Sequence, residues 1–427
     1  MKSRLSPLYL LSALIVSVFA LSSVYPTLRI LVLGGKPISG LPNTIFAFFP
    51  DLLFLVTFGY ALFLFFTKRE FRFQWQGFDT VVSLYLVFNL VYGYVLSNNT
   101  TLALLSVRIT YLPVALYFVA RLLNAQAVTL NKRLLHSVFL LYAGIALLGL
   151  LIYFVFPSVQ AKLISVSGYE SPRYFIIRMC SLYLTPILFA FVMAFSAIYF
   201  YLRSLKNISV GDSICFLMLW TCLVLTVSRG AIMSFGLAFV IISLIYKNYK
   251  TSLVLGMGMS LIILSVSFYA TRNLDFLQWM FYSSSKTVNM DKDLARVNRW
   301  QTTFDDFKKQ PWGYGLGNSG AVAFTHLINK KDAKAAVYST DGWYLKMACE
   351  NGVLGLLSYL LLAGSFLRQV IKKIRTNSDE LALLALGVFI IVSIQSIFSN
   401  SLDFHPEISL FWLIAGLAMN TYTKNVS

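Results

Sequence analysis

The feature that most constrains this chain is a succession of apolar runs, each close to the length that crosses a bilayer. A membrane-spanning helix needs about 20 predominantly apolar residues, and this chain of 427 residues is 58% hydrophobic and only 12% charged. The runs cover residues 6–25, 44–67, 78–97, 101–122, 134–156, 180–202, 212–227, 230–247, 252–270, 343–366, 380–399 and 407–422. We therefore predict an all-α polytopic membrane protein with about 12 transmembrane helices.

One arginine interrupts the longest apolar stretch. Arg229 lies in "LVLTVSRGAIMSFG" at 223–236, and a charged side chain at the centre of a bilayer costs about 2.5–3.5 kcal/mol or more. The surrounding stretch, 212–247, is too long for one helix across a core of about 30 Å but suits two short helices. The sequence predicts a helical hairpin with Arg229 at its tip.

The distribution of basic residues predicts the orientation, because Lys and Arg are enriched in short cytoplasmic loops. Every second loop between the apolar runs is basic. These loops and the termini contain Lys2, Arg4, Lys68, Arg69, Arg72, Arg121, Lys132, Arg133, Arg203, Lys206, Lys247, Lys250, Arg368, Lys372, Lys373, Arg375 and Lys424. We expect both termini in the cytoplasm and the Arg229 tip on the outer side.

The longest polar segment divides the chain into three regions. We expect nine helices in 1–270, a large outer loop at 271–341, and three further helices in 342–427. The segment 271–340 contains ten Lys and Arg against six Asp. Two interpretations are open: a solvated cap, and a basic chamber for an anionic substrate.

The outer loop contains one predicted amphipathic helix, at 293–309, which Pro311 ends. Its apolar residues recur at helical spacing, namely Leu294, Val297, Trp300, Phe304 and Phe307. Arg296 and Arg299 share one face of this helix; they either pair with nearby aspartates or bind a ligand. The glycines of "PWGYGLGNSG" then allow tight turns and a close approach to a ligand.

Asp341 stands where the chain is expected to re-enter the membrane, in "STDGWYLKMACENGVLG". An aspartate at this position either caps the following helix or takes part in chemistry on the outer face.

Three motifs occur in one order: "TVSRGA", then "ARVNRW" before "PWGYGLG", then "STDGWYL" before "ENGVLG". In this the chain resembles the O-antigen polymerase and ligase family of bacterial membrane proteins, most specifically over 223–356. The resemblance implies a GT-C-like fold and a glycosyltransferase in the bacterial inner membrane, with its active site periplasmic. The implied donor is a glycan linked to undecaprenyl pyrophosphate, with no metal and no cofactor. Implied partners are these glycans, membrane lipids, a chain-length regulator and a flippase, but not nucleic acid.

The resemblance also implies roles for individual residues. Arg229 corresponds to the arginine of the SRG turn and Arg296 to the loop arginine four residues before a tryptophan, with Arg299 as an additional candidate. In ligases a His-Asn pair usually precedes the "YL" of the re-entering helix. Here those positions are Asp341 and Gly342, which favours a polymerase that joins repeat units of O-antigen or a related surface polysaccharide.

These residue types suit the chemistry. A guanidinium binds phosphate bidentately and keeps its proton, so Arg229 and Arg296 can hold a departing lipid pyrophosphate. A carboxylate can accept the proton of the acceptor hydroxyl, and Asp341 is the candidate base. Further candidates for lining an outer chamber are Arg108, Arg173, Arg178, Glu170 and His405. The arginines among them alternatively reach lipid headgroups, and Glu170 is the next candidate base.

Two other functions stay open at this stage. An O-antigen ligase would transfer finished polymer to the lipid A core, and differs in its acceptor. A transporter of lipid-linked oligosaccharide or another anion would use the arginines to line a path, but such transporters often contain two similar halves, and no repeat is visible in this sequence.

Overall fold

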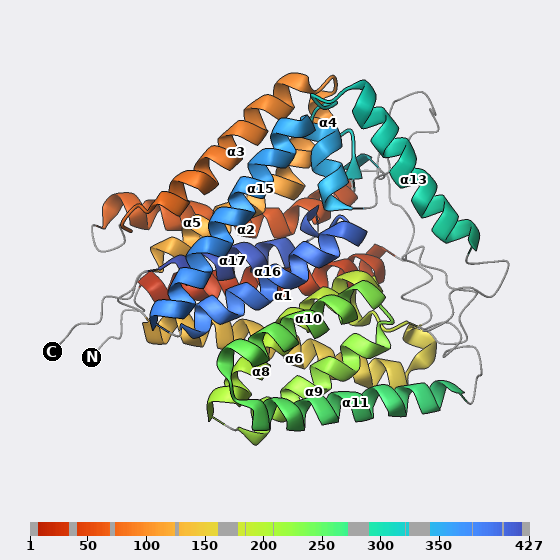
Figure 1. Cartoon of the computed structure of the whole chain (residues 1–427). Helices are drawn as coiled ribbons and strands as arrows, with labels where there is room; N and C mark the ends of the chain where they lie inside the picture. Colours follow the sequence, from red (N-terminus) through yellow and green to blue (C-terminus); the bar gives the residue numbers. More distant parts are fainter. Residues whose placement is uncertain are drawn as a thin grey trace. The chain divides into compact units, whose positions relative to one another are not determined.

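All the regular elements that can be described in this protein are helices (Figure 1). The computed structural model describes residues 7–33, 41–68, 73–123, 128–160, 178–183, 185–207, 209–271, 290–320, 322–323, 342–377, 379–403 and 405–420. Within them, ten helices are long and apolar enough to cross a membrane, and two shorter apolar helices, Val210–Leu225 and Glu407–Met419, accompany them. The prediction of an all-α polytopic membrane protein is confirmed.

Most helices begin and end within a few residues of the predicted runs, but the first continues to Leu33 and the one that begins at Trp343 continues to Asn377. They are α1 (Pro7–Leu33), α2 (Leu41–Thr67), α3 (Gly77–Leu96), α6 (Val128–Val155), α8 (Pro186–Asn207), α9 (Val210–Leu225), α10 (Arg229–Tyr246), α11 (Tyr249–Thr271), α13 (Met290–Lys309), α15 (Trp343–Asn377), α16 (Glu380–Phe398) and α17 (Glu407–Met419). The amphipathic helix of the outer loop is α13, which starts a few residues earlier than predicted and ends before Pro311, as expected.

The predicted run at 101–122 is helical throughout but irregular. It consists of α4 (Thr100–Ser106), a π-helical turn (Val107–Tyr111), a 3-10 turn (Leu112–Val114) and α5 (Ala115–Leu122). Pro113 lacks the N–H that a regular helix would use here. Single π-helical turns inside helices are frequent at functional sites, and this one carries Arg108 and Thr110.

The chain forms two compact units. Unit 1 comprises the described residues of Met1–Phe73, Leu116–Leu277 and Leu413–Ser427, and unit 2 those of Gln74–Ala115 and Gln278–Trp412. In unit 1, α8 packs against α9 and α10 and is buried on almost every side. In unit 2, α15 packs against α3, α13 and α16, and the ring of Phe366 contacts the rings of Phe78, Phe389 and Phe411.

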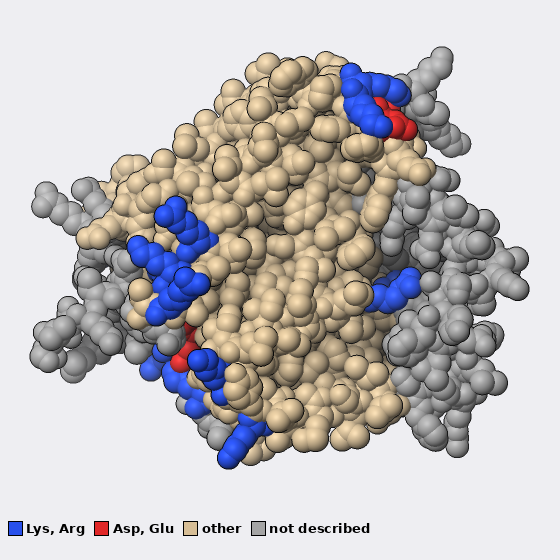
Figure 2. Space-filling view, in the orientation of Figure 1, with Lys and Arg blue, Asp and Glu red and all other residues tan. Residues whose placement is uncertain are grey.

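Large apolar side chains are exposed along the outward faces of several helices. On α3 they include Leu84, Val87, Val91 and Val95. In Figure 2 most of the described residues in view are uncharged, and the Lys and Arg residues form a few separate groups. Apolar surface on this scale is unusual in a soluble monomer, and on helices of this length it is the surface that lipid covers.

The long helix α15 is two helices joined at a kink. Gly352 has φ 65° and ψ −163°, which is not helical. The segment 343–351 before the kink is mostly buried within unit 2, whereas exposed apolar side chains start at Val353 and Leu354 and continue through Leu361. The lipid-facing part of α15 therefore begins at the kink.

The boundaries of α8, α10 and α15 make the predicted orientation testable. A reporter fused after Asn207, Lys250 or Asn377 should behave as cytoplasmic, and one inserted near Lys330 as periplasmic, because basic loops stay inside. Paired alkaline phosphatase and green fluorescent protein fusions measure this. A periplasmic signal at Lys250 would contradict an outward-facing tip at Arg229.

Candidate functional site

The turn between α9 and α10 carries the first candidate residue. α9 ends at Leu225 and α10 begins at Arg229, so the predicted hairpin with Arg229 at its tip is confirmed. Arg229 is exposed. Val227 in the turn has φ 54°, a left-handed conformation that is rare for a β-branched residue. Such outliers cluster at functional sites.

Arg178, a weaker candidate in the sequence, lies against the same turn. Its Nε donates a hydrogen bond to the carbonyl of Thr226 at 2.9 Å, and the N–H of Met179 donates to the carbonyl of Leu225 at 3.0 Å. The side-chain amide of Gln160 donates to the carbonyl of Arg178 at 2.9 Å. Unit 1 thus holds two arginines at the start of α10, where the positive end of the helix dipole also favours an anion.

The remaining predicted site residues divide between unit 2 and the segments outside the described residues. Arg296 and Arg299 lie in α13, in unit 2. Asp341, Arg173 and Glu170 lie outside the described residues. The assembly of Arg229 and Arg296 around one pyrophosphate therefore stays a prediction.

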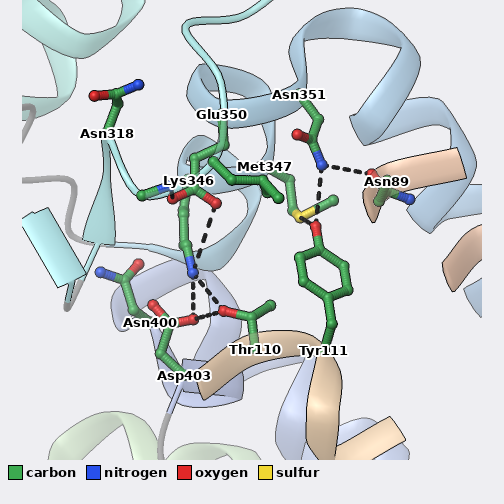
Figure 3. Close-up of polar contacts among 12 residues, drawn as sticks. Asn89, Thr110, Tyr111, Asn318, Lys346, Met347, Glu350, Asn351, Asn400 and Asp403 are labelled. Atoms are coloured by element: carbon green, nitrogen blue, oxygen red, sulfur yellow. Dashed lines mark hydrogen bonds and ion pairs between the residues drawn. The ribbon is translucent and has the colours of Figure 1, made fainter. Parts of the chain in front are cut away.

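Unit 2 contains a buried ionic cluster that the sequence analysis missed (Figure 3). Lys346 of α15 forms ion pairs with Asp403 and, at 3.7 Å, with Glu350; all three side chains have 0% exposure. The ammonium of Lys346 also donates to the hydroxyl of Thr110 at 2.8 Å, and this hydroxyl donates to Asp403 at 2.8 Å. The cluster joins the π-helical turn, α15 and the segment after α16.

Burial gives these contacts their importance. A charge removed from water is costly unless opposite charges and hydrogen bonds compensate it. Lys346 is compensated by its two carboxylate partners, and its Nζ also lies 5.0 Å from the centre of the Trp343 ring. Glu350 is further held by the N–H of Gly317, which donates to its Oε1 at 2.9 Å.

Two candidate chamber residues flank the cluster in sequence. Arg108 lies in the same π-helical turn as Thr110, and His405 follows Asp403 by two positions. Burial, together with the positive charge of Arg108, lowers the pKa of His405 to about 4. Its Nδ1 is 2.7 Å from the hydroxyl of Ser409. His405 is therefore neutral at physiological pH and adds no positive charge beside Arg108.

The glycine-rich loop has a different role from the one the sequence suggested. It binds the kink of α15: the N–H groups of Tyr314 and Gly315 donate to the carbonyls of Cys349 and Glu350 at 2.7 and 2.8 Å. In return, the N–H of Val353 donates to the carbonyl of Pro311 at 2.9 Å. A Cβ at Gly317 would collide with the backbone of Leu102. Here the glycines allow backbone to approach backbone.

Asn351, beside the kink, extends this polar network. Its side-chain amide donates to Asn89 Oδ1 at 2.7 Å and to the hydroxyl of Tyr111 at 3.0 Å (Figure 3). Asn89 in turn donates to the hydroxyl of Ser358 at 2.9 Å. The network connects α3, the π-helical turn and α15 on both sides of Gly352.

Comparison with known proteins finds a family match for part of the chain. Residues 214–360 match a family model described as O-antigen ligase, a region that starts in α9 and ends in α15 and includes the Arg229 turn, the glycine-rich loop and Lys346. No curated protein matches the chain. The helices define a polytopic membrane protein. Over 214–360, about a third of the chain, it is similar to the O-antigen ligase family.

The kink predicts opposite effects for two glycines of the same helix. Gly352→Ala should lower stability, because the left-handed backbone costs about 1–3 kcal/mol and the new Cβ would collide with Trp312. Gly364→Ala is the matched control: its Cβ would have nothing within 4 Å, and alanine favours helix by about 0.5–1 kcal/mol. Thermal unfolding in detergent measures both. Equal thermal unfolding midpoints for the two variants would show that stability does not depend on the backbone conformation at Gly352.

The buried cluster predicts an effect of charge removal. Lys346→Met should destabilise the protein by about 3–5 kcal/mol, because it leaves buried carboxylates uncompensated, and adding Asp403→Asn should restore part of the loss. Lys309→Met is the control, since Lys309 pairs with Asp306 but is 73% exposed, and such pairs contribute about 0–1 kcal/mol. The same unfolding assay applies, and a Lys346→Met loss no larger than the control's would contradict the charge argument.

Proposed function

We propose that this protein is a polymerase that joins oligosaccharide repeat units linked to undecaprenyl pyrophosphate, on the periplasmic face of the inner membrane. The main supporting observation is the α9–α10 turn, where Arg178 donates a hydrogen bond to Thr226 and Arg229 begins α10. Arg229 lies inside the region that matches the family model. The family match supports a polymerase or ligase activity. Asp341 and Gly342, in place of the His-Asn pair usual in ligases, favour the polymerase.

The proposed reaction is a glycosyl transfer. The acceptor hydroxyl oxygen forms a bond to C1 of the donor sugar, and the bond from C1 to the pyrophosphate oxygen breaks. The electron pair of that bond leaves with the lipid pyrophosphate. Arg229 and Arg296 hold this group and stabilise its growing negative charge, with Arg299 as a further contact.

Asp341 is the proposed acceptor of the hydroxyl proton. It lies two positions before Trp343, the first residue of α15. A carboxylate within hydrogen-bond reach of the acceptor can take this proton and contribute to general base catalysis. The growing chain and the donor both remain linked to lipid, so a flippase and a chain-length regulator are the expected partners.

A ligase is the second candidate, because the matching family model carries that description. It would use the same leaving group but a lipid A core acceptor. Purified protein supplied with lipid-linked repeat units, without ATP or an ion gradient, distinguishes the two. A ladder of polymer on the lipid carrier indicates the polymerase; transfer of the glycan to added lipid A core, without a ladder on the carrier, indicates the ligase.

Substitutions test the assigned residues in this assay. Arg229→Lys and Arg296→Lys should each greatly reduce polymer, because Lys lacks the planar fork that binds phosphate bidentately. Asp341→Asn keeps the shape of the side chain but should lower turnover by roughly 10² or more. Arg375→Lys, at the opposite end of α15 from Asp341, is the control.

The outcomes separate the roles. Near-normal polymer from Arg229→Lys or Arg296→Lys at normal expression would remove that residue from the pyrophosphate site. Near-normal polymer from Asp341→Asn would leave Asp341 as a helix cap and make Glu170 the next base to test. A loss of polymer from Arg375→Lys would show that the assay reports general damage to the protein.

A further inference from the structure

Two aromatic side chains near the C-terminal end of α13 are largely exposed. Trp312 is 61% exposed and Phe304 is 51% exposed. Exposing a large aromatic ring to water costs free energy. Tryptophan in particular is enriched where a membrane meets water, since its ring is apolar and its N–H is polar.

Hydrogen bonds hold the backbone at Trp312 next to the end of α3 and the kink of α15. Its carbonyl accepts a hydrogen bond from the hydroxyl of Tyr92 at 2.9 Å, about one turn before α3 ends at Leu96. The adjacent carbonyl of Pro311 accepts from Val353 at 2.9 Å, where the lipid-facing part of α15 begins. Trp312 thus lies at the border of the apolar surface that α3 and α15 expose.

Phe304 lies on the exposed side of α13, eight residues before Trp312. Thr303 and Asp306 are buried on the packed face of this helix. The ammonium of Lys308, one turn after Phe304, lies 4.6 Å from the centre of the Phe304 ring. The rings of Phe304 and Phe307 stack with their centres 6.4 Å apart. Phe304 and Lys308 share a helix ridge, and the helix ends at Lys309, three residues before Trp312.

We propose that this aromatic edge, Phe304 and Trp312, is a membrane anchor that inserts into the headgroup layer of the outer leaflet. At Trp312 this edge adjoins the lipid-facing sides of α3 and α15, through the hydrogen bonds of Tyr92 and Val353. Lys308 and Lys309 pair with Asp305 and Asp306, so the edge carries no net charge from these four residues. Its partner is therefore a lipid surface of any headgroup charge, held by apolar contact at the interface.

The anchor has a consequence for the proposed reaction. Arg296 and Arg299 belong to the same helix, so a bilayer-bound α13 keeps them near the layer in which the pyrophosphate of a lipid carrier lies. This consequence rests on the proposed function, whereas the anchor itself does not.

Site-specific probes test the anchor in the full-length protein. Trp312→Cys and Phe304→Cys, made with Cys215→Ser to remove the partly exposed native thiol, carry an environment-sensitive fluorophore in phosphatidylcholine nanodiscs. Thr302→Cys is the matched control, because Thr302 is exposed but lies about 200° around the helix from position 304. Quenchers placed at shallow and deep positions of the lipid chain, and aqueous iodide, report the depth of each probe.

Labels at 304 and 312 should be quenched by the shallow lipid quencher and protected from iodide, and the label at 302 should show the reverse. Anionic lipid should not change this pattern. Equal iodide quenching at all three positions, or quenching that needs anionic lipid, would overturn the proposal.

A second measurement needs no substitution. Wild-type protein in nanodiscs that contain a photoreactive headgroup should crosslink at Phe304 or Trp312, and the absence of crosslinks to 300–312 would also overturn the anchor. Both readouts are independent of polymer formation. An inactive protein with a lipid-inserted edge would reject the proposed function alone, and an active protein with a water-exposed edge would reject only the anchor.

Discussion

The kink of α15 at Gly352 depends on a strict requirement for backbone hydrogen bonds. Near or within a bilayer, an N–H or carbonyl without a partner costs several kcal/mol, so a broken helix is tolerated only where other groups replace the missing bonds. The loop 311–317 supplies these replacements through Pro311, Tyr314 and Gly315. The close fit leaves no room for side chains at Gly317 and Gly352. The hydrogen bonds between the loop 311–317 and the kink of α15 therefore fix how these two segments of unit 2 pack together.

The two units solve different physical problems. In unit 2, buried charges compensate each other around Lys346, and the amide network of Asn351 ties three helical segments together. In unit 1, the α9–α10 turn exposes Arg229 and holds Arg178 by its Nε. Removal of a buried ion-pair partner is strongly destabilising, although such pairs rarely exceed apolar packing in net stability. The cluster accordingly suits a role in fixing how the segments pack, while the exposed turn suits contact with an anion.

The sequence predicts the helices well and the polar contacts poorly. Apolar runs and basic loops are local signals, so the ends of α9 and α10 around Arg229 and the end of α13 before Pro311 agree with expectation. Most partners of Lys346 are distant in the sequence. Glu350, one helical turn away, can be recognised as a partner from spacing alone, whereas Asp403 and Thr110 cannot. The kink was missed because Gly352 in an apolar run resembles any small helical residue. The glycine-rich loop was recognised, and in the structure it makes its close contacts with the backbone of α15.

The distances along the chain within the Lys346 cluster bear on how the protein is made. Thr110 and Asp403 are separated by 293 residues. The π-helical turn therefore leaves the ribosome long before Lys346 and Asp403, the partners of Thr110, have been synthesised. During this interval Arg108 and Thr110 must reside in the membrane or at its surface with temporary partners such as water, lipid headgroups or the insertion machinery. Only when α15 and the segment after α16 arrive can the cluster close. Assembly of unit 2 is therefore a late event in biogenesis, and a nascent chain that lacks its last quarter has no means of completing it.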